Sequence, residues 1–259
     1  MRRRRGRPLN GWLIVDKPSG MTSTQVVGRA KRLFDAQKVG HGGTLDPLAT
    51  GLLPLAFGTA TKTVPYVMDG TKVYQFTLRM GDARDSDDAD GAVTATSDVR
   101  PTDEQLRAAL PALTGDIMQV PPVYSALKVA GERAYDMARD VALACGTVGH
   151  IAVLRRLRVG PFTEADAIML DKLAPNDDNA HASAELLLPV ETALADIPAL
   201  ALTEEESVLL RHGRALSLLD LMGRIPQTDA SGTVRVMDAG RVLGLGRLED
   251  GQLKPVRIL

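Results

Sequence analysis

The sequence predicts an α/β protein in which helices and strands alternate along most of the chain, followed by a small β-rich region. With 259 residues, 44% of them hydrophobic, the chain can bury a substantial core. Residues 73–80 alternate apolar and polar side chains, which is the period of a half-buried strand. After residue 198, short apolar runs are separated by turns that contain glycine. We therefore predict two domains, residues 1–197 and 198–259.

The N-terminal part predicts a strand, a turn and a helix in succession. Residues 13–15 are apolar and typical of a short buried strand, and residues 16–20 are typical of a turn. A hydroxyl among residues 22–24 can cap the following helix. The apolar side chains of that helix recur at helical spacing, and they are Val26, Ala30, Leu33 and Phe34. Its opposite face is basic, as solvated helix faces often are.

A glycine-rich loop at residues 40–51 carries one carboxylate, Asp46, directly before a proline. The glycines allow left-handed backbone conformations, and the proline restricts the aspartate to an extended or turn form. An apolar run follows at residues 52–57, so Asp46 lies where a loop enters a buried segment and its environment can tune it for chemistry. The alternative is an ordinary Asp-Pro turn without a chemical role.

Residues 59–62 predict a short helix that ends or kinks near Pro65. The strand at residues 73–80 follows, with Tyr74 on its apolar face. Periodicity by itself makes Tyr74 a core residue. An aromatic ring with a polar tip is also suited to stacking on an unpaired RNA base.

The acidic segment at residues 81–91 does not match a calcium-binding loop, because a serine stands where the bidentate glutamate is required. We interpret it as a hairpin whose carboxylates accept backbone hydrogen bonds. Nor does His150 have a second metal ligand at suitable spacing, so a structural role is favoured. We predict no metal.

The rest of the chain predicts two helices, a strand and the β-rich region. Thr102 opens a capping box for a short helix that stops near Pro111. Apolar residues between 134 and 145 can line one helix ending at Gly146, and residues 150–160 predict a strand. Beyond residue 198, a capped helix ending near residue 213 precedes strands around 233–237, 241–245 and 253–258.

Composition and charge narrow the class of function. No apolar run reaches 18 residues and no signal peptide is evident, so we predict no membrane span. The single cysteine excludes an intramolecular disulfide, and a cytoplasmic protein fits best. Residues 1–80 carry 13 Lys and Arg against 4 Asp and Glu, a distribution that attracts polyanions such as RNA. The arginines of residues 2–7 could equally form a solubilising tail.

Several segments together resemble the bacterial tRNA pseudouridine-55 synthases of the TruB type. Residues 40–51 follow the pattern Gly-His-x-Gly-x-Leu-Asp-Pro-x-Ala-x-Gly, and residues 10–23 resemble the Asn-Gly…Asp-Lys-Pro-x-Gly segment that precedes it. Residues 119–128 resemble a Pro-x-x-Tyr-Ser-Ala-x-Lys segment. The resemblance implies an α+β catalytic domain with a mixed, largely antiparallel sheet flanked by helices. It also implies a small PUA-like RNA-binding domain at residues 198–259.

The resemblance implies a reaction and roles for particular residues. The T-loop uridine at position 55 of tRNA would be isomerised to pseudouridine without a cofactor. By resemblance, Asp46 is the nucleophile, His41 fills the space left by the flipped base, and Tyr74 and Leu154 contact the base. We expect a monomer whose partner is the tRNA T-stem-loop. Phosphates would be held by the N-terminal arginines and by three lysines, Lys17, Lys62 and Lys128.

The chain departs from the resembled family after Arg139. Family members continue there through an insertion arm, a strand and a Lys-Gly-Thr-Tyr-x-Arg motif, and we expect roughly 40 to 50 residues to be absent. In the family, the arginine of that motif pairs with the nucleophilic aspartate. Arg155 and Arg156 are candidates to replace it. The gap should also remove sheet strands and leave backbone donors and apolar surface to be covered.

Two other classes of function follow from the same gap. The chain could bind or fold tRNA without catalysis, because the basic half is intact while the site lacks its motif. It could also be a damaged product that does not fold stably. Loss of tRNA modification in Asp46→Asn distinguishes the enzyme from the first alternative, and a cooperative unfolding transition argues against the second.

Overall fold

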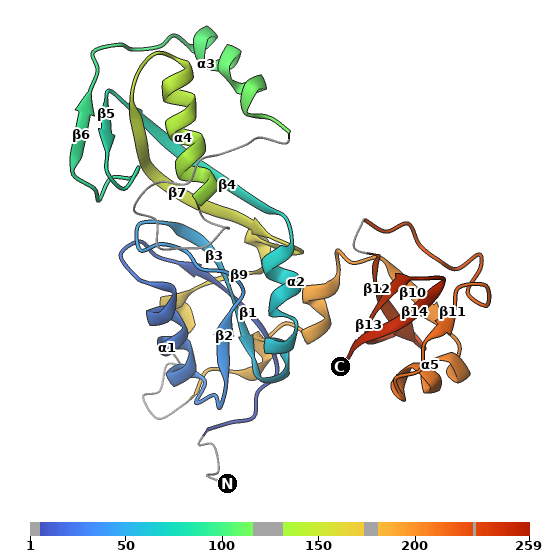
Figure 1. Cartoon of the computed structure of the whole chain (residues 1–259). Coiled ribbons are helices and arrows are strands. Elements are labelled where there is room, and N and C mark those ends of the chain that lie inside the picture. Colours follow the sequence, from blue (N-terminus) through green and yellow to red (C-terminus); the bar gives the residue numbers. More distant parts are fainter. Residues whose placement is uncertain (1–5, 116–131, 174–180, 230–231) are drawn as a thin grey trace. The chain divides into compact units, whose positions relative to one another are not determined.

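The computed structural model describes residues 6–115, 132–173, 181–229 and 232–259, with side chains of the helix beginning at residue 132 described from Met137 onward. The chain divides into two compact units, Met1–Leu188 and Pro189–Leu259. Our expected boundary, after residue 197, thus lies nine residues beyond the observed boundary after Leu188. The predicted α/β class is confirmed (Figure 1).

The first unit is built on a seven-stranded mixed sheet. Its strands are β1 (Gly11–Lys17), β2 (Val39–His41), β3 (Thr50–Phe57), β4 (Lys72–Met80), β7 (Gly149–Val159), β8 (Phe162–Thr163) and β9 (Ala167–Met169). The central order is β4-β7-β3-β1-β9, with β2 paired to β3 and β8 to β7. Pairings β1/β9 and β3/β7 are parallel and the others antiparallel, so the sheet is mixed and largely antiparallel as expected.

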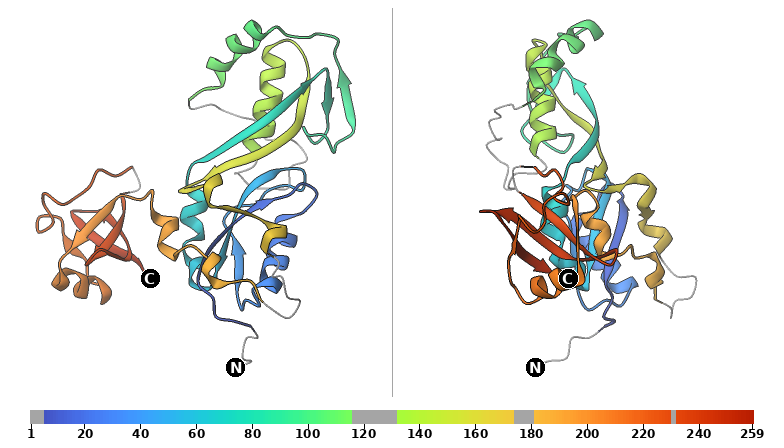
Figure 2. Two further views of the ribbon diagram at one scale, coloured as in Figure 1. Left: turned by 180° about the vertical axis from the view of Figure 1, so that it is seen from behind. Right: turned by 90° about the vertical axis from the view of Figure 1, so that its right-hand side faces the viewer.

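Helices and a small hairpin complete the first unit (Figures 1 and 2). The α-helices are α1 (Ser23–Leu33), α2 (Val64–Asp69), α3 (Asp103–Ala109) and α4 (Glu132–Ala144). The hairpin consists of β5 (Asp82–Arg84) and β6 (Val93–Thr96). The 3-10 helices of this unit are η1 (Gly58–Lys62), η2 (Leu110–Leu113), η3 (Glu164–Asp166), η4 (Leu170–Leu173) and η5 (Ala184–Leu186).

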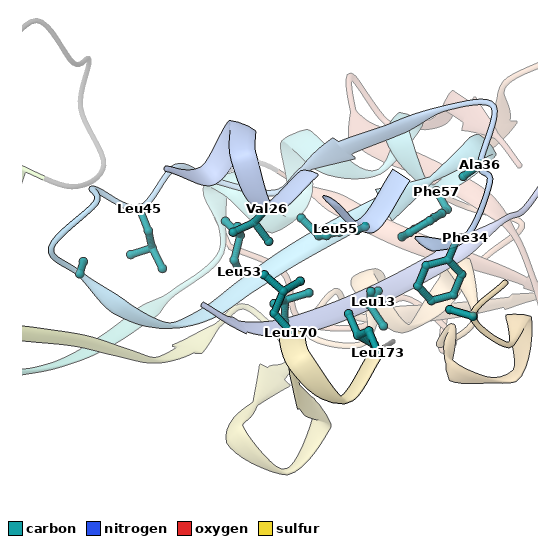
Figure 3. Packing of buried hydrophobic residues seen from close by; sticks show 14 of the residues in the cluster. Leu13, Val26, Phe34, Ala36, Leu45, Leu53, Leu55, Phe57, Leu170 and Leu173 are labelled. Atoms are coloured by element: carbon teal, nitrogen blue, oxygen red, sulfur yellow. The ribbon is translucent and has the colours of Figure 1, made fainter. Parts of the chain in front are cut away.

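The main core lies between α1 and the strands β1 and β3 (Figure 3). Thr22 caps α1 through a capping box with Gln25, and the helix directs Val26 and Ala30 into the core, as their spacing predicts. β3 is buried along almost its whole length, since both of its faces are covered. The loop residue Leu45 is 5% exposed and belongs to the same core. The glycine loop is therefore attached directly to the best-packed part of the unit.

A ribbon of β4 and β7 extends from this core, and α4 lies against it (Figures 1 and 2). The two strands pair antiparallel from Lys72↔Val159 to Met80↔Gly149, with two register shifts. The helix runs without a break through the expected join after Arg139 and ends before Gly146, which has φ +70°. The sheet closes because β4 and β7 pair directly, and the join lies within a helix.

The acidic segment forms the β5–β6 hairpin, and its carboxylates accept backbone donors as predicted. Asp87, almost fully buried, has φ +56° and receives a 3.0 Å hydrogen bond from Arg139 of α4. Its carbonyl accepts the backbone N–H of Ile151 in β7. The hairpin is thus attached both to the ribbon and to the helix that carries the join.

The helix expected at residues 59–62 ends near Pro65 as predicted, but the second helix that begins beside this proline was not expected. η1 ends at Lys62, whereas Pro65 stands in the first turn of α2 rather than at the end of a helix. The first turn tolerates proline because its N–H has no intrahelical acceptor. The helix expected to stop near Pro111 does so through η2, in which that proline is again near the start.

The second unit is a five-stranded sheet packed against one α-helix. The elements are η6 (Val190–Leu194), β10 (Ala199–Leu202), α5 (Glu204–Arg211), β11 (Leu216–Ser217), β12 (Thr233–Asp238), β13 (Arg241–Glu249) and β14 (Gln252–Ile258). The strand order is β10-β12-β13-β14-β11. Thr203 caps α5 as predicted, and the three C-terminal strands lie where the glycine-containing turns place them. In the part of the chain that the structure describes, no helix is long and apolar enough to cross a membrane.

Candidate active site

The loop that carries Asp46 is held by hydrogen bonds on both sides of that residue. Ser23 of α1 accepts the backbone N–H of Leu45 at 2.8 Å and donates to its carbonyl at 2.9 Å. The carbonyl of Pro47 accepts the N–H of Gly20 at 2.8 Å and the Nζ of Lys17 at 3.1 Å. These bonds connect the loop to α1 and to the turn after β1. The predicted fixed, non-helical position of the aspartate is confirmed.

The side chain of Arg156 binds the other half of the same loop. Nη2 donates to the carbonyl of Gly43 at 3.1 Å, Nη1 to that of Thr44 at 3.2 Å, and Nε to that of Leu52 at 2.8 Å. The side chain comes from β7 and is almost completely buried. Burial lowers the pKa of Arg156, while Tyr74 and the negative charge of Asp46 raise it. Asp46 therefore has a buried guanidinium among its electrostatic partners.

Tyr74 lies beside this arginine because the two residues are directly opposite each other on β4 and β7. The phenol forms a side-chain hydrogen bond with the guanidinium. Tyr74 is only partly buried and packs against the main core. The ring thus contributes to the core, as its periodicity predicts, and its hydroxyl lies beside Arg156. Stacking of the ring on an RNA base stays a prediction.

His41, the last residue of β2, also belongs to this group. Its Nδ1 is buried and has no hydrogen-bond partner among the described residues. Burial lowers the pKa of His41, and the positive charge of Arg156 lowers it further. The imidazole is therefore neutral at neutral pH and keeps an unused polar atom near the loop.

Leu154 lies two residues before Arg156 on β7 and opposite Phe76 of β4. It is 2% exposed and is part of the main core. Because successive side chains of a strand alternate between faces, Leu154 shares a face with Arg156. Leu154 is thus a core residue on the same face of β7 as Arg156, and its contact with a base stays a prediction.

The expectation that Lys17 holds a phosphate is wrong. Its side chain is fully buried, and Nζ donates to the carbonyls of Pro18, Met21 and Pro47 at 2.7–3.1 Å. All three ammonium protons are thereby used within the protein. Burial lowers the pKa of Lys17 to about 8, and the charge of Asp46 opposes that shift. Lys17 holds the loop and adds a second buried cation near the carboxylate.

The remaining expected phosphate ligands are only partly described. Lys62 is exposed at the end of η1. Lys128 and the arginines at positions 2–5 lie outside the described residues, as does the segment 119–128 that resembles the family. Among the described residues, no cluster of His, Cys, Asp and Glu could hold a metal ion.

Of the two candidate arginines, only Arg156 reaches the loop. Arg155 faces the other way, where Nη1 and Nη2 each donate to a carboxylate oxygen of Asp16 at 2.9 Å and a further bond reaches Glu164. The alternation of side chains along β7 places the two neighbours on opposite faces. This distinction required the strand register. Ser23 was also missed as a loop-holding residue, because sequence reasoning could assign its hydroxyl only to a helix cap.

Comparison with known proteins identifies the family. Residues 31–145 match the N-terminal domain of the TruB family pseudouridylate synthases. Residues 136–195 match the tRNA pseudouridylate synthase B C-terminal domain, and residues 198–259 match the C-terminal domain of pseudouridine synthase II TruB. The chain belongs to the TruB family of pseudouridine synthases. It is thus a member of a family of isomerases, as its motifs predicted.

Two curated TruB relatives match over all of this chain. The tRNA pseudouridine synthase B of Gluconacetobacter diazotrophicus is 65% identical, with 100% of both chains covered. The protein of the same name from Gluconobacter oxydans is 47% identical, covering 100% of this chain and 93% of the relative. The first alignment spans 306 positions whereas this chain has 259 residues, a difference of 47. That difference agrees with the expected absence of 40 to 50 residues.

Solved structures show the same TruB-type fold. A structure described as an H/ACA ribonucleoprotein bound to a substrate RNA containing 2'-deoxyuridine has a TM-score of 0.70 and 22% identity, covering 100% of this chain and 90% of that one. An archaeal box H/ACA Nop10–Cbf5 complex has a TM-score of 0.68 and 23% identity, covering 97% of this chain and 85% of that one. At these identities the likeness concerns the fold.

Proposed function

We propose that this protein isomerises the uridine at position 55 in the T-loop of tRNA to pseudouridine, with Asp46 as the nucleophile. The observation that carries the proposal is the fixing of the Asp46 loop beside a buried guanidinium, a tyrosine and a neutral histidine. A carboxylate held in this way can act on a reacting centre without paying to reorganise its surroundings. The names of the curated relatives point to tRNA as the substrate.

The reaction needs no change of oxidation state. The bond between the sugar and uracil N1 breaks, the base turns, and a bond forms between the sugar and uracil C5. N1 gains a proton and C5 loses one, so the atoms balance. Asp46 acts as the nucleophile in the step that detaches the base from the sugar. This chemistry requires no cofactor to accept or supply electrons.

The neighbouring residues have roles in binding the base. A uridine inside a folded loop must be flipped out before it can be reached, which costs stacking energy. The imidazole of His41, whose Nδ1 has no hydrogen-bond partner among the described residues, fills the vacated space in the RNA. Tyr74 and Leu154 contact the flipped base, the former through its ring face. Lys62, Lys128 and the N-terminal arginines bind phosphates.

We infer that a monomer acts in the cytoplasm on the T-stem-loop of tRNA. The single cysteine, Cys145, fits a reducing compartment. The charge of residues 1–80 fits an RNA partner, with 13 basic against 4 acidic side chains. The monomer is tested by sedimentation with and without a T-stem-loop RNA.

Single-turnover conversion of uridine in a T-stem-loop RNA tests the proposed activity, with RNA binding measured on the same sample. Wild-type protein is expected to convert the target uridine, and Asp46→Asn to lower the rate by at least about 10³-fold while RNA affinity stays within about twofold. The matched control is Asp69→Asn, an exposed aspartate of α2, which should retain full activity. Unchanged conversion by Asp46→Asn would refute the nucleophile assignment.

A second candidate, an RNA-binding protein without catalysis, is favoured by the 47 alignment positions that have no counterpart in this chain. The same experiment separates the two. Tight, salt-dependent binding of the T-stem-loop by wild-type protein without conversion would support the binding protein and contradict the enzyme. Conversion of uridine that depends on Asp46 would exclude a binding protein without catalysis.

A further inference from the structure

We propose that Arg156 is the positioning residue of Asp46: its guanidinium both supplies the positive charge that balances the carboxylate and holds the loop that carries it. This inference rests on the proposed role of Asp46 as the nucleophile and adds a partner that the sequence left open between Arg155 and Arg156. Its basis is the set of hydrogen bonds that this one side chain makes to the loop.

The guanidinium of Arg156 forms several hydrogen bonds to the Asp46 loop and to the strand that follows it. It donates to the carbonyls of Gly43 and Thr44, which precede Asp46, and to the carbonyl of Leu52 in the strand that follows. Tyr74 adds a further hydrogen bond. The forked donor group of arginine can satisfy several acceptors at fixed angles, whereas an ammonium acts as a point charge. One side chain therefore joins the two ends of the Asp46 loop.

The backbone around Arg156 is shaped to allow this approach. Gly51 has φ +95°, and a Cβ atom there would lie 2.2 Å from the carbonyl oxygen of Arg156. Gly43 has φ +118°, and its Cβ would lie 3.6 Å from Nη1. Gly51 thus admits the strand at close range, whereas at Gly43 the positive φ, rather than a lack of space, favours glycine.

A role in holding carbonyls does not by itself require a full charge. A charged group that is almost completely buried loses its hydration, and this cost is met only if a counter-charge lies nearby. Asp46 is the carboxylate whose charge acts on Arg156. Lys17 approaches from the other side of the loop through Pro47. Arg155 is directed to Asp16 and Glu164 and is not available to the site.

The test follows the protonation of Asp46 directly, by the ¹³Cγ resonance of aspartate-labelled protein across a pH titration. The Asp46 resonance is identified by its loss in Asp46→Asn. Arg156→Gln keeps an amide donor for the loop but removes the charge, and we expect the titration midpoint of Asp46 to lie above that of the wild type. Arg156→Lys keeps the charge, and its midpoint should stay near that of the wild type.

The matched control is Arg155→Gln, the same change one residue away on the opposite face of β7. Its Asp46 midpoint should equal that of the wild type. A midpoint unchanged in Arg156→Gln, or raised equally in Arg155→Gln, would overturn the proposal. A purely structural role would lower the melting temperature of both Arg156 variants without moving the midpoint of Asp46.

A second measurement leaves Arg156 in place, for the case in which Arg156→Gln does not fold. Removing its counter-charge by Asp46→Asn should lower the melting temperature by several degrees relative to Asp69→Asn, because a buried guanidinium is left unbalanced. Equal melting temperatures would overturn the proposal. Neither measurement depends on catalysis. If the variants show these shifts but the wild-type protein converts no uridine, the proposed function is contradicted and the Arg156 inference still holds.

Discussion

The two halves of the large sheet differ in how completely they are covered. β1 and β3 are buried over almost their whole length, and the Asp46 loop is attached to them. Along β4 the inward side chains are only half buried, alternating with exposed ones from Lys72 to Met80. On β7, Val153 is 54% exposed while Leu154 is 2% exposed. The ribbon thus has one thinly covered side.

This difference locates the effect of the shortened chain. This chain lacks 47 of the positions in its alignment with the Gluconacetobacter diazotrophicus protein. Its ribbon is held by the direct pairing of β4 with β7 and by packing against α4. The segments that hold the Asp46 loop, in contrast, belong to residues 11–57, together with Arg156 of β7. A change in the well-covered half should therefore cost much more stability than the same change in the ribbon.

The largest effect is expected for Gly51→Ala, which lies where the two halves meet. The new Cβ would lie 2.2 Å from the carbonyl oxygen of Arg156, at a φ of +95° that alanine avoids. We expect a loss of about 4 kcal/mol or more in the free energy of unfolding, measured by chemical denaturation. The control is Gly28→Ala in α1, where no atom lies within 4 Å of the new Cβ. This change should stabilise by about 0.5–1 kcal/mol.

A pair of leucine truncations compares the halves directly. Leu53→Ala in β3 removes a fully buried side chain and should cost about 2–5 kcal/mol. Leu78→Ala in β4 removes a half-buried one and should cost about 1 kcal/mol. Both losses in the free energy of unfolding are measured from denaturation curves. A single cooperative transition of the wild type would also argue against the alternative of a damaged product that does not fold stably. Equal losses would show that the ribbon is as well packed as the core.

The third prediction concerns pH and Lys17. Burial lowers the pKa of this lysine to about 8 from 10.5, so the unfolded chain binds more protons than the folded one between these values. The contribution of Lys17 to the free energy of unfolding should therefore rise as pH increases from about 8 to 10.5. Denaturation of the wild type and Lys17→Met at pH 7 and pH 10 measures it. A constant difference between the two proteins would contradict the prediction.

The smallest effect on the free energy of unfolding is expected in the β5–β6 hairpin, which contacts the ribbon through Asp87. Burial raises the pKa of Asp87, and Arg139 only partly opposes this shift. A carboxyl with a raised folded pKa stabilises the protein most at low pH and loses that contribution as pH rises through the folded value. Asp87→Asn should therefore become more stable relative to the wild type between pH 4 and pH 7. The variant keeps a residue that tolerates the φ of +56° at this position.

Much of the local structure could be predicted because its causes are local. The capping boxes at Thr22, Thr102 and Thr203 each begin a helix, and the alternation of residues 73–80 forms β4. The Asp-Pro step and its glycines place Asp46 on a fixed loop. The helix at residues 58–62 ends near Pro65 as expected, but α2 was not predicted, since a proline suits the first turn of a helix as well as the end of the preceding one.

The sequence by itself determined the α/β class, the order of its elements, the family and the presence of a carboxylate in a rigid loop, because these depend on spacing, capping and motif. Only the tertiary structure decided which cations surround that carboxylate. Arg155 and Arg156 are adjacent and chemically identical, and the pleat of β7 sends them to opposite faces. The sequence predicted that Lys17 is a surface ligand for RNA phosphates. In the structure Lys17 is buried and donates to three backbone carbonyls, so it helps to hold the Asp46 loop. Burial and register arise from contacts between distant segments, so no local pattern could reveal them.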